Sequence, residues 1–264
     1  MLTKLSDGTP IHCIRKPEAR MLDHHVEGYL QHGIQINPGD VVFDVGANVG
    51  VFGVRVLQKA PDVTVFCFEP IPEIADALRA NASLHGQGRM VVIQEGVSAA
   101  PGEATFTYFP NTPALSTAHP EQWDENPGAF QAAVKSTMKN PPVSMRWMRL
   151  IPTVFSGLIA KHLVKGRHTV TCKLTTIAEV IKNHNLDRID LMKIDCEGAE
   201  WDTLMGIGDA HWSKIKSMVI EVHDEEGRLG HVKQLLNKHG FSRQVVEQEE
   251  GLENSKMYNL FALR

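Results

Sequence analysis

Acidic, amide and glycine residues follow an apolar run near residue 44, at a spacing that suits a charged ligand. Residues 41–50 read Val-Val-Phe-Asp-Val-Gly-Ala-Asn-Val-Gly, which puts Asp44, Gly46, Asn48 and Gly50 at one strand-to-helix loop. Glycines let such a loop turn tightly and approach a ligand at the mouth of a parallel sheet. A dinucleotide loop would read G-x-G-x-x-G and hold its pyrophosphate at the helix N-terminus. The D-x-G-x-N-x-G spacing favours a ligand with a cationic amino-acid end and no phosphate, such as S-adenosylmethionine (SAM).

A second carboxylate, Glu69, follows the next apolar run, 63–68, and lies 25 residues after Asp44. A carboxylate about 20 residues past a glycine loop can accept hydrogen bonds from both ribose hydroxyls. NAD sites share this feature, so Glu69 alone does not distinguish the two cofactors. The alternative is an acid near a helix N-terminus, since Pro70 and Pro72 follow it. The pair of acids at this spacing favours a nucleoside site.

The composition is that of an ordinary globular protein. The 264 residues are 42% apolar and 22% charged, enough for one large domain with a full core. The net charge of -4 gives no strongly basic surface for nucleic acid. Neither a zinc site nor a disulfide framework is expected, since no C-x-x-C pair occurs among Cys13, Cys67, Cys172 and Cys196. The sequence has no secretory leader and no apolar run of membrane-spanning length, so we expect a cytoplasmic protein without stable membrane insertion.

Four segments of the chain resemble one enzyme family. They are 42–50, 68–70 (Phe-Glu-Pro), 174–177 (Leu-Thr-Thr-Ile) and 192–200, which reads Met-Lys-Ile-Asp-Cys-Glu-Gly-Ala-Glu. Together they resemble the FkbM-type SAM-dependent methyltransferases, and K-I-D-x-E-G-x-E is the most diagnostic stretch. The resemblance runs from about Leu5 to the end of the chain. The N-terminal helix and a long insertion look similar to those of O-methyltransferases from polyketide and peptide synthase clusters, which methylate hydroxyl groups.

The resemblance implies a Rossmann-like class I methyltransferase fold, and the pattern of elements agrees with it. We expect a hairpin turning at Asp7 and Gly8, helices near 22–32, 51–59, 72–85, 176–184, after Gly198 and up to 239, and strands near 41–45, 63–68, 90–94, 103–109, 170–174, 189–194, 217–222, 242–247 and 257–263. Alternating strands and helices build a parallel sheet. We therefore expect an α/β fold with a seven-stranded, mostly parallel sheet that ends in an antiparallel hairpin. It forms a single domain over 1–264, with an N-terminal helical cap over 1–38 and a lid insertion over 111–168.

The predicted cofactor site lies at the carboxyl ends of the strands, where open α/β sheets bind ligands. The resemblance and the loop chemistry assign the methionine end of SAM to Asp44, Gly46, Asn48 and Gly50, the ribose to Glu69, the adenine to Gly96, Val97 and Ser98, and the amino end of SAM or the substrate to Asp195.

A proton must leave the acceptor hydroxyl during methyl transfer, and His223 is the candidate base. An imidazole titrates near neutral pH, and His223 follows the strand 217–222 at the expected substrate edge. Glu221 shares a strand face with His223 and would orient it or stabilise its charge, while Asp195 completes the predicted catalytic set. The alternative is that this segment only opens the next helix.

Asp195, Glu197 and Glu200 form an acidic cluster with two interpretations. Hard oxygen ligands suit a divalent metal, which could hold a substrate hydroxylate. Contacts to the SAM amino group, together with acids at a helix N-terminus, are the favoured alternative, so no metal site is predicted. Lys193 is expected to pair with one of these acids. Helical residues His24, His25 and Tyr29 could face the site, although such residues more often fill a surface or core.

The insertion is strongly basic. No acidic residue occurs between Glu125 and Glu179, whereas eight basic ones do: Lys135, Lys139, Arg146, Arg149, Lys161, Lys165, Arg167 and Lys173. Apolar residues over 154–163 recur at helical spacing. A long insertion in a compact domain is usually a lid or binding loop. The segment 135–173 could also dock an acidic acyl or peptidyl carrier protein that presents a tethered substrate. A membrane surface contact and a merely solvated basic face are the alternatives.

These observations predict a SAM-dependent O-methyltransferase that acts on a hydroxyl of a secondary metabolite, either free or bound to a carrier protein. Methyltransferases that act on a sugar, RNA or protein are the first alternatives, and the net charge argues against RNA. A SAM-binding regulator without turnover is the non-enzymatic alternative. The loop spacing disfavours an NAD oxidoreductase.

Overall fold

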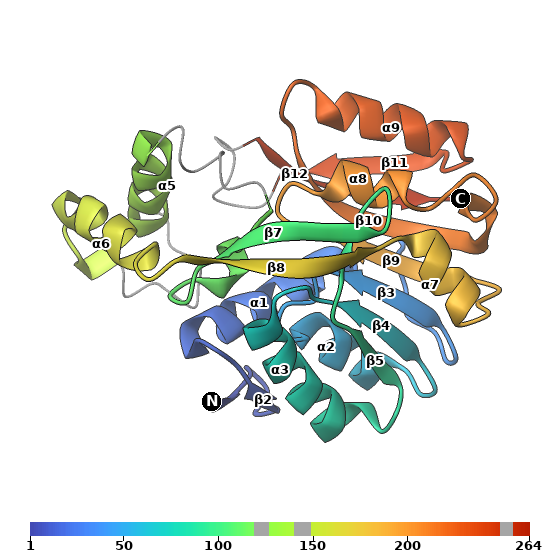
Figure 1. The fold of residues 1–264 in the computed structure, drawn as a ribbon, viewed down its shortest axis with the longest axis horizontal. Coiled ribbons are helices and arrows are strands. Elements are labelled where there is room, and N and C mark those ends of the chain that lie inside the picture. The colour runs from blue at the N-terminus through green and yellow to red at the C-terminus, as the bar shows by residue number, and fades with distance from the viewer. Residues whose placement is uncertain (119–126, 140–148, 249–255) are drawn as a thin grey trace.

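A computed structural model describes residues 1–118, 127–139, 149–248 and 256–264, and its centre is one seven-stranded sheet (Figure 1). Its strands run in the order β11-β12-β10-β9-β3-β4-β5. Their bounds are β3 Val41–Val45, β4 Thr64–Phe68, β5 Met90–Ile93, β9 Ile189–Ile194, β10 Ile215–His223, β11 Arg243–Glu247 and β12 Met257–Leu263. Strand β12 runs antiparallel to both of its neighbours, β10 and β11, and every other pair of neighbouring strands in this sheet is parallel. The predicted class I methyltransferase architecture is confirmed.

Helices cover both faces of this sheet, so its central strands are apolar on both sides. The helices are α1 Lys16–Tyr29, α2 Val51–Lys59, α3 Pro72–Asn81, α7 Ile177–Asn183, α8 Glu200–Met205 and α9 Arg228–Lys238. On β3, Val42 packs in the cluster that contains α1, α2 and α3, whereas its neighbour Phe43 packs in the cluster that contains α7, α8 and α9. This alternation explains why parallel strands read as continuous apolar runs.

A second sheet crosses over the first. It has three strands in the order β6-β8-β7, with bounds β6 Gly96–Val97, β7 Gly102–Tyr108 and β8 His168–Thr175. The antiparallel ribbon β7–β8 carries α5 (Pro127–Lys139) and α6 (Ser156–Leu163) at its far end (Figure 1). The strands predicted near 103–109 and 170–174 therefore exist, but they belong to this ribbon. The ribbon is the stem of the insertion.

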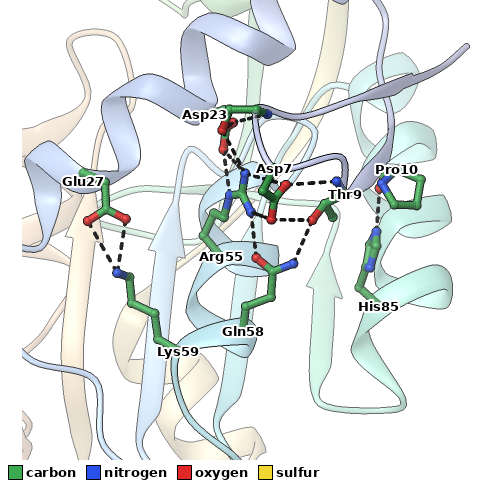
Figure 2. A network of polar contacts seen from close by, with 10 residues as sticks. Asp7, Thr9, Pro10, Asp23, Glu27, Arg55, Gln58, Lys59 and His85 are labelled. Carbon is green, nitrogen blue, oxygen red and sulfur yellow. Dashed lines mark hydrogen bonds and ion pairs between the residues drawn. The ribbon is translucent and has the colours of Figure 1, made fainter.

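The N-terminal cap is bound to the core by a polar network (Figure 2). The predicted hairpin is formed by β1 (Leu2–Lys4) and β2 (Pro10–His12). The Arg55 side chain on α2 donates to Asp7 at 2.6 Å in the hairpin turn and to Asp23 at 2.7 Å on α1. Helix α1 begins six residues before the predicted start, because Pro17 suits its first turn, and it ends at Tyr29. The cap and α2 thus form one packed unit.

The other predicted boundaries are close to the observed ones. Helix α3 ends at Asn81 and is followed by one turn of π-helix, η1 (Ala82–Gly86), where the sequence predicts a continuous helix to residue 85. Helix α7 begins where the sequence predicts, and Thr176 caps it by accepting a hydrogen bond from the backbone of Glu179 at 3.1 Å in a capping box. In the described part of the chain, no helix is long and apolar enough to cross a membrane.

Candidate active site

A cavity of about 390 Å³ opens at the carboxyl ends of β3, β4, β9 and β10. Its size lies in the range typical of small-molecule sites. The predicted site residues that line it are Gly46, Asn48, Glu69, Gly96, Val97, Asp195 and Glu221. The predicted residues outside its wall are Asp44, Gly50, Ser98 and His223. The structure therefore brings seven of the predicted residues to the wall of one cavity and places the other four outside that wall.

The glycine loop is shaped by close backbone contacts. Gly46 has φ +77°, and a Cβ atom there would lie 1.7 Å from the backbone oxygen of Asp195, so only glycine fits. Asn48 also has a left-handed backbone (φ 49°), and its side-chain oxygen accepts from the Val49 N–H at 2.7 Å. Gly50 begins α2 behind the wall, where a Cβ would lie 2.5 Å from Leu78. Its role is to turn and pack the chain.

Glu69 is fixed at the end of β4 by two backbone donors. One carboxylate oxygen accepts from Asn48 at 3.1 Å, and the other accepts from Ile71 at 3.0 Å. Burial raises the pKa of Glu69 to about 7 against the effect of these two bonds. Glu69 lines the cavity, so this carboxyl could receive a vicinal diol.

Apolar and backbone groups form the next part of the wall. Gly96 and Val97 line the cavity together with the side chains of Ile71 and Ile74. Ser98 lies beyond the wall, where its backbone N–H donates to Thr175 at 2.9 Å in the β6–β8 pairing. This flat, mostly apolar region could hold a planar base.

A buried lysine lies beneath the loop. The Lys193 ammonium is 3.1 Å from Asp44, 3.4 Å from Asp195 and 3.0 Å from the backbone oxygen of Gly46. Burial opposes this charge, but the two carboxylates outweigh burial and raise the pKa of Lys193 above its usual range. The predicted pairing of Lys193 with an acid is confirmed. Asp44 is fully buried, so its predicted link to a ligand would run through Lys193 and the loop.

Three acidic residues line the cavity beyond Lys193: Asp195, Glu197 and Glu221. Tyr29 of α1 donates to Asp195 at 3.0 Å. Burial and the neighbouring carboxylates raise the pKa of both Glu197 and Glu221 well above the usual range. Within the described ranges, no three His, Cys, Asp or Glu side chains converge as metal ligands would.

His223 lies behind this acidic wall. Its Nδ1 atom is 3.1 Å from Glu200, and its Nε2 atom is 3.7 Å from Glu197. Burial lowers the pKa of His223, but the hydrogen bond and charge of Glu200, with the charge of Glu221, raise it overall. The predicted closeness of Glu221 and His223 is thus seen as an electrostatic interaction, while Glu200 makes the hydrogen bond.

The cap and the insertion supply further wall residues, and among these the sequence named His25 and Tyr29 as residues that could face the site. Pro113, Ala114, Leu115 and Ser116, from η2 (Pro113–Leu115) and the residue after it, line the cavity. Helix α1 contributes Met21, Leu22, His25, Val26 and Tyr29. His24, by contrast, is exposed. The buried Glu18 side chain accepts from the Ala114 N–H, and Arg15 donates to the Pro110 oxygen at 3.1 Å. These contacts lock the start of the insertion to the cap.

Comparisons with known proteins agree with this geometry. The family model for the methyltransferase FkbM domain matches residues 44–243. The chain is 33% identical to 31-O-demethyl-FK506 methyltransferase FkbM of Streptomyces tacrolimicus, over 99% of this chain and 96% of that protein. It is 32% identical to the AMB antimetabolite synthetase AmbE of Pseudomonas aeruginosa, over 90% of this chain but 11% of AmbE. The crystal structure of methyltransferase FkbM from Methylobacillus flagellatus superposes with a TM-score of 0.50 and 12% identity, covering 92% of this chain and 51% of that one.

Proposed function

This chain belongs to the FkbM methyltransferase family, and from that premise we propose that it moves a methyl group from SAM to a hydroxyl group of a secondary metabolite. One observation carries the proposal most: the glycine loop, the fixed Glu69 carboxyl and the acids around Asp195 share the wall of one cavity. That combination offers partners for a nucleoside at one end and for a cationic amino acid at the other.

Each part of SAM has a matching group on the cavity wall. Glu69 would bind the ribose diol, Gly96 and Val97 would border the adenine, and Asp195 would bind the ammonium of the methionine end. Gly46 and Asn48 would let the backbone approach that end. Three predicted residues would act from behind the wall. Asp44 would hold Lys193, Gly50 would shape the glycine loop, and Ser98 would hold the turn after β6. When bound, SAM supplies an activated methyl group, and the protein aligns the acceptor and receives its proton.

A hydroxyl acceptor is supported by the names of relatives. The S. tacrolimicus protein is an O-methyltransferase by name, and so is 2-O-methyltransferase NoeI of Sinorhizobium fredii, which is 27% identical over 81% of this chain. Hexuronic acid methyltransferase AglP of Haloferax volcanii, 23% identical over 70% of the chain, keeps a sugar as an alternative acceptor. The net charge of -4 argues against RNA.

His223 with Glu221 and Asp195 forms the proposed proton-handling set. His223 is linked to the cavity through Glu197 and to the interior through Glu200. His223→Ala is expected to leave SAM affinity nearly intact and to reduce turnover by about 10²-fold or more, the usual contribution of general acid–base groups. Unchanged turnover would remove His223 from the mechanism, and SAM binding without turnover on any acceptor would favour a regulator.

We propose that residues 1–264 act as one domain. The cap (1–38) and the insertion (111–168) both contribute side chains to the cavity wall, and the cap is tied to the core through Arg55. Removal of either segment is therefore expected to open the cavity and abolish SAM binding.

A carrier-bound substrate is the form we propose for the acceptor, with docking through 135–173. Val154, Leu158, Lys161 and Lys165 recur at helical spacing on and beside α6, and all four are exposed. Leu150 is 85% exposed near this stripe. An apolar stripe that continues into lysines complements an acidic carrier protein. Arg146 lies outside the described residues.

Charge reversal tests this docking. Lys161→Glu with Lys165→Glu is expected to raise KM for a carrier-bound hydroxyacyl substrate and to leave KM for the released substrate unchanged. Lys233→Glu with Lys238→Glu, on the exposed side of α9, is the matched control. Equal turnover of the carrier-bound substrate by both variants would refute docking. Binding of the native protein to anionic vesicles, lost in the α6 variant, would identify a membrane contact instead.

Titration calorimetry with SAM, S-adenosylhomocysteine and NAD, with and without magnesium, tests the cofactor. We expect micromolar binding of SAM and S-adenosylhomocysteine, no binding of NAD and no change with magnesium. Binding of NAD, or of none of the three, would refute the proposed function together with the residue roles above.

A further inference from the structure

Glu197 and Glu221 reach the same wall of the cavity from different elements. Glu221 belongs to β10, whereas Glu197 lies in the turn between β9 and α8. The parallel register pairs Ile220 with Ile194, so the residues that follow, Glu221 and Asp195, lie at the same level of the sheet. Both glutamates line the cavity beside Asp195, and the His223 ring does not. A ligand in the cavity therefore meets these carboxyl groups before it meets the imidazole.

The turn that presents Glu197 is held in an uncommon backbone conformation. Glu197 has φ +51°, a region that residues other than glycine rarely adopt. Its backbone oxygen accepts from the Thr117 hydroxyl at 2.7 Å, and the next N–H, of Gly198, donates to the buried Glu200 at 2.7 Å. Strained residues held by several contacts cluster at functional sites. The insertion, through Thr117, thus helps to set the position of this carboxyl.

Acidic groups outnumber the cations around Glu197 and Glu221. The charged and titratable groups around this pair come from every element packed against it. They are Lys193 and Asp195 at the end of β9, Glu200 on α8, His223 on β10, Arg228 on α9 and Tyr29 on α1. Glu69, Glu95 and His25 line other parts of the cavity wall. Lys193 is 3.1 Å from Asp44 and 3.4 Å from Asp195, while Arg228 and His223 both pair with Glu200. Among the described residues, the only ion pair of Glu197 is with His223 at 3.7 Å, and Glu221 forms none.

We propose that Glu197 and Glu221 form a carboxyl pair that ionises when a cationic cofactor enters the cavity and that then accepts the proton of the acceptor hydroxyl. This inference rests on the SAM-dependent methyl transfer proposed above. His223 is a positioning residue in this scheme, because its charge stabilises the ionised pair from behind the wall. Glu197, which the sequence placed only in an acidic cluster, becomes a catalytic residue.

In this step one proton moves from the acceptor hydroxyl to the carboxyl pair, and the positive charge of the sulfonium is lost. The acceptor's O–H bond breaks while its oxygen bonds to the methyl carbon, the methyl–sulfur bond breaks, and a carboxylate of the pair takes the proton. The products are the methyl ether, a neutral thioether and a protonated carboxyl. A positive charge near the pair favours its ionised form, and that charge disappears as the methyl group leaves. The pair therefore gains affinity for a proton at the step that releases one.

Burial and the neighbouring carboxylates raise the pKa of both Glu197 and Glu221, which favours their protonated forms and agrees with this scheme. Binding of a sulfonium cation should displace part of these protons into solution, whereas binding of the neutral thioether product should displace fewer. Coupled groups share such a proton, so the prediction concerns the pair.

Titration calorimetry in two buffers of different ionisation enthalpy at pH 7 measures this proton release directly. We expect SAM to release a substantial fraction of one proton and S-adenosylhomocysteine to release clearly less. The variant Glu197→Gln with Glu221→Gln should lose most of this difference while it still binds S-adenosylhomocysteine, which shows that it is folded. Its kcat should fall by about 10²-fold or more at neutral pH. Glu103→Gln, on the exposed surface of β7, is the control.

The possible results separate the two proposals. SAM binding with equal proton release for both ligands, or a double variant that keeps the native kcat, would overturn the carboxyl pair and leave the proposed function intact. Failure of SAM to bind the native protein would overturn the proposed function itself.

Discussion

The buried lysine beneath the glycine loop gives a quantitative prediction. Lys193 is 3.1 Å from Asp44, whose side chain is fully buried, and the lysine side chain is itself only 5% exposed. In Lys193→Met the apolar stem is kept and the charge is lost, so Asp44 stays in the interior without its cation. Breaking a buried pair in this way typically costs about 3–5 kcal/mol of unfolding free energy. We expect a loss in this range at pH 7.

The loss should depend on pH, and the structure fixes the sign. Burial raises the pKa of Asp44 even beside the ammonium, and removal of the ammonium raises it further. A carboxyl whose pKa is raised in the folded state binds more protons when folded than when unfolded. The stability of Lys193→Met should therefore fall as pH rises above about 4, by about 1.4 kcal/mol per pH unit, until the folded pKa is passed. Its deficit relative to the native protein should therefore widen over the pH range in which the Asp44 carboxyl still binds a proton in the folded variant but no longer does so in the native protein.

Urea unfolding at pH 5, 6 and 7 measures the deficit. Lys193→Met combined with Asp44→Asn removes the titrating carboxyl, so it should abolish most of the added pH dependence. Lys233→Met, on the exposed side of α9, should change stability by less than about 0.5 kcal/mol. A deficit for Lys193→Met below about 1 kcal/mol at pH 7, or one that is constant with pH, would refute the reasoning.

Three further predictions concern the loop, the cap and the insertion. Gly46→Ala should abolish SAM binding, because its Cβ would lie 1.7 Å from a backbone oxygen, whereas Gly28→Ala, which meets no atom within 4 Å, should bind normally in the same titration. Glu18→Gln should be more stable than the native protein at pH 8 by up to about 3 kcal/mol in urea unfolding, and equal to it near pH 4. Burial raises the pKa of Glu18 to about 7, so its contribution to stability is lost as pH rises towards that value; a constant difference would contradict this. Arg55→Met should cost about 2 kcal/mol and speed hydrogen exchange in the cap, and unchanged exchange would show that the network does not hold the cap.

Much of the central sheet could be predicted from the sequence. The observed bounds of α2 and β9 equal the predicted ones, because apolar runs there are framed by glycine and acidic residues. The strands near 103–109 and 170–174 could also be found by alternation. Their pairing with each other in a separate ribbon could not, because alternation gives the face of a strand and not its partner. The segment between the two predicted strands of the terminal hairpin, 249–255, lies outside the described residues.

The site residues show a similar limit. Strand spacing placed Glu221 and His223 on one face, but only Glu221 reaches the cavity, because Glu200 holds the imidazole at 3.1 Å. Apart from His25 and Tyr29, which the sequence named as residues that could face the site, the wall residues on α1 and at 113–116 come from segments without any chemical motif. Their place depends on tertiary contacts such as the bond from Ala114 to Glu18, which local sequence does not encode.

The charges of the site explain why a lysine and several acids are buried together. Lys193 forms ion pairs with Asp44 and Asp195, and Arg228 and His223 both form ion pairs with Glu200. Glu197 and Glu221 are half-buried, and their raised pKa values favour the protonated forms, which carry no charge into the cavity wall. A ligand that brings a positive charge would then stabilise the ionised form of Glu197 and Glu221. The same binding event would make a carboxylate available to accept the proton of the acceptor hydroxyl. A neutral analogue of the same shape would fill the cavity without ionising the pair, so affinity and proton release should be separable properties of this site.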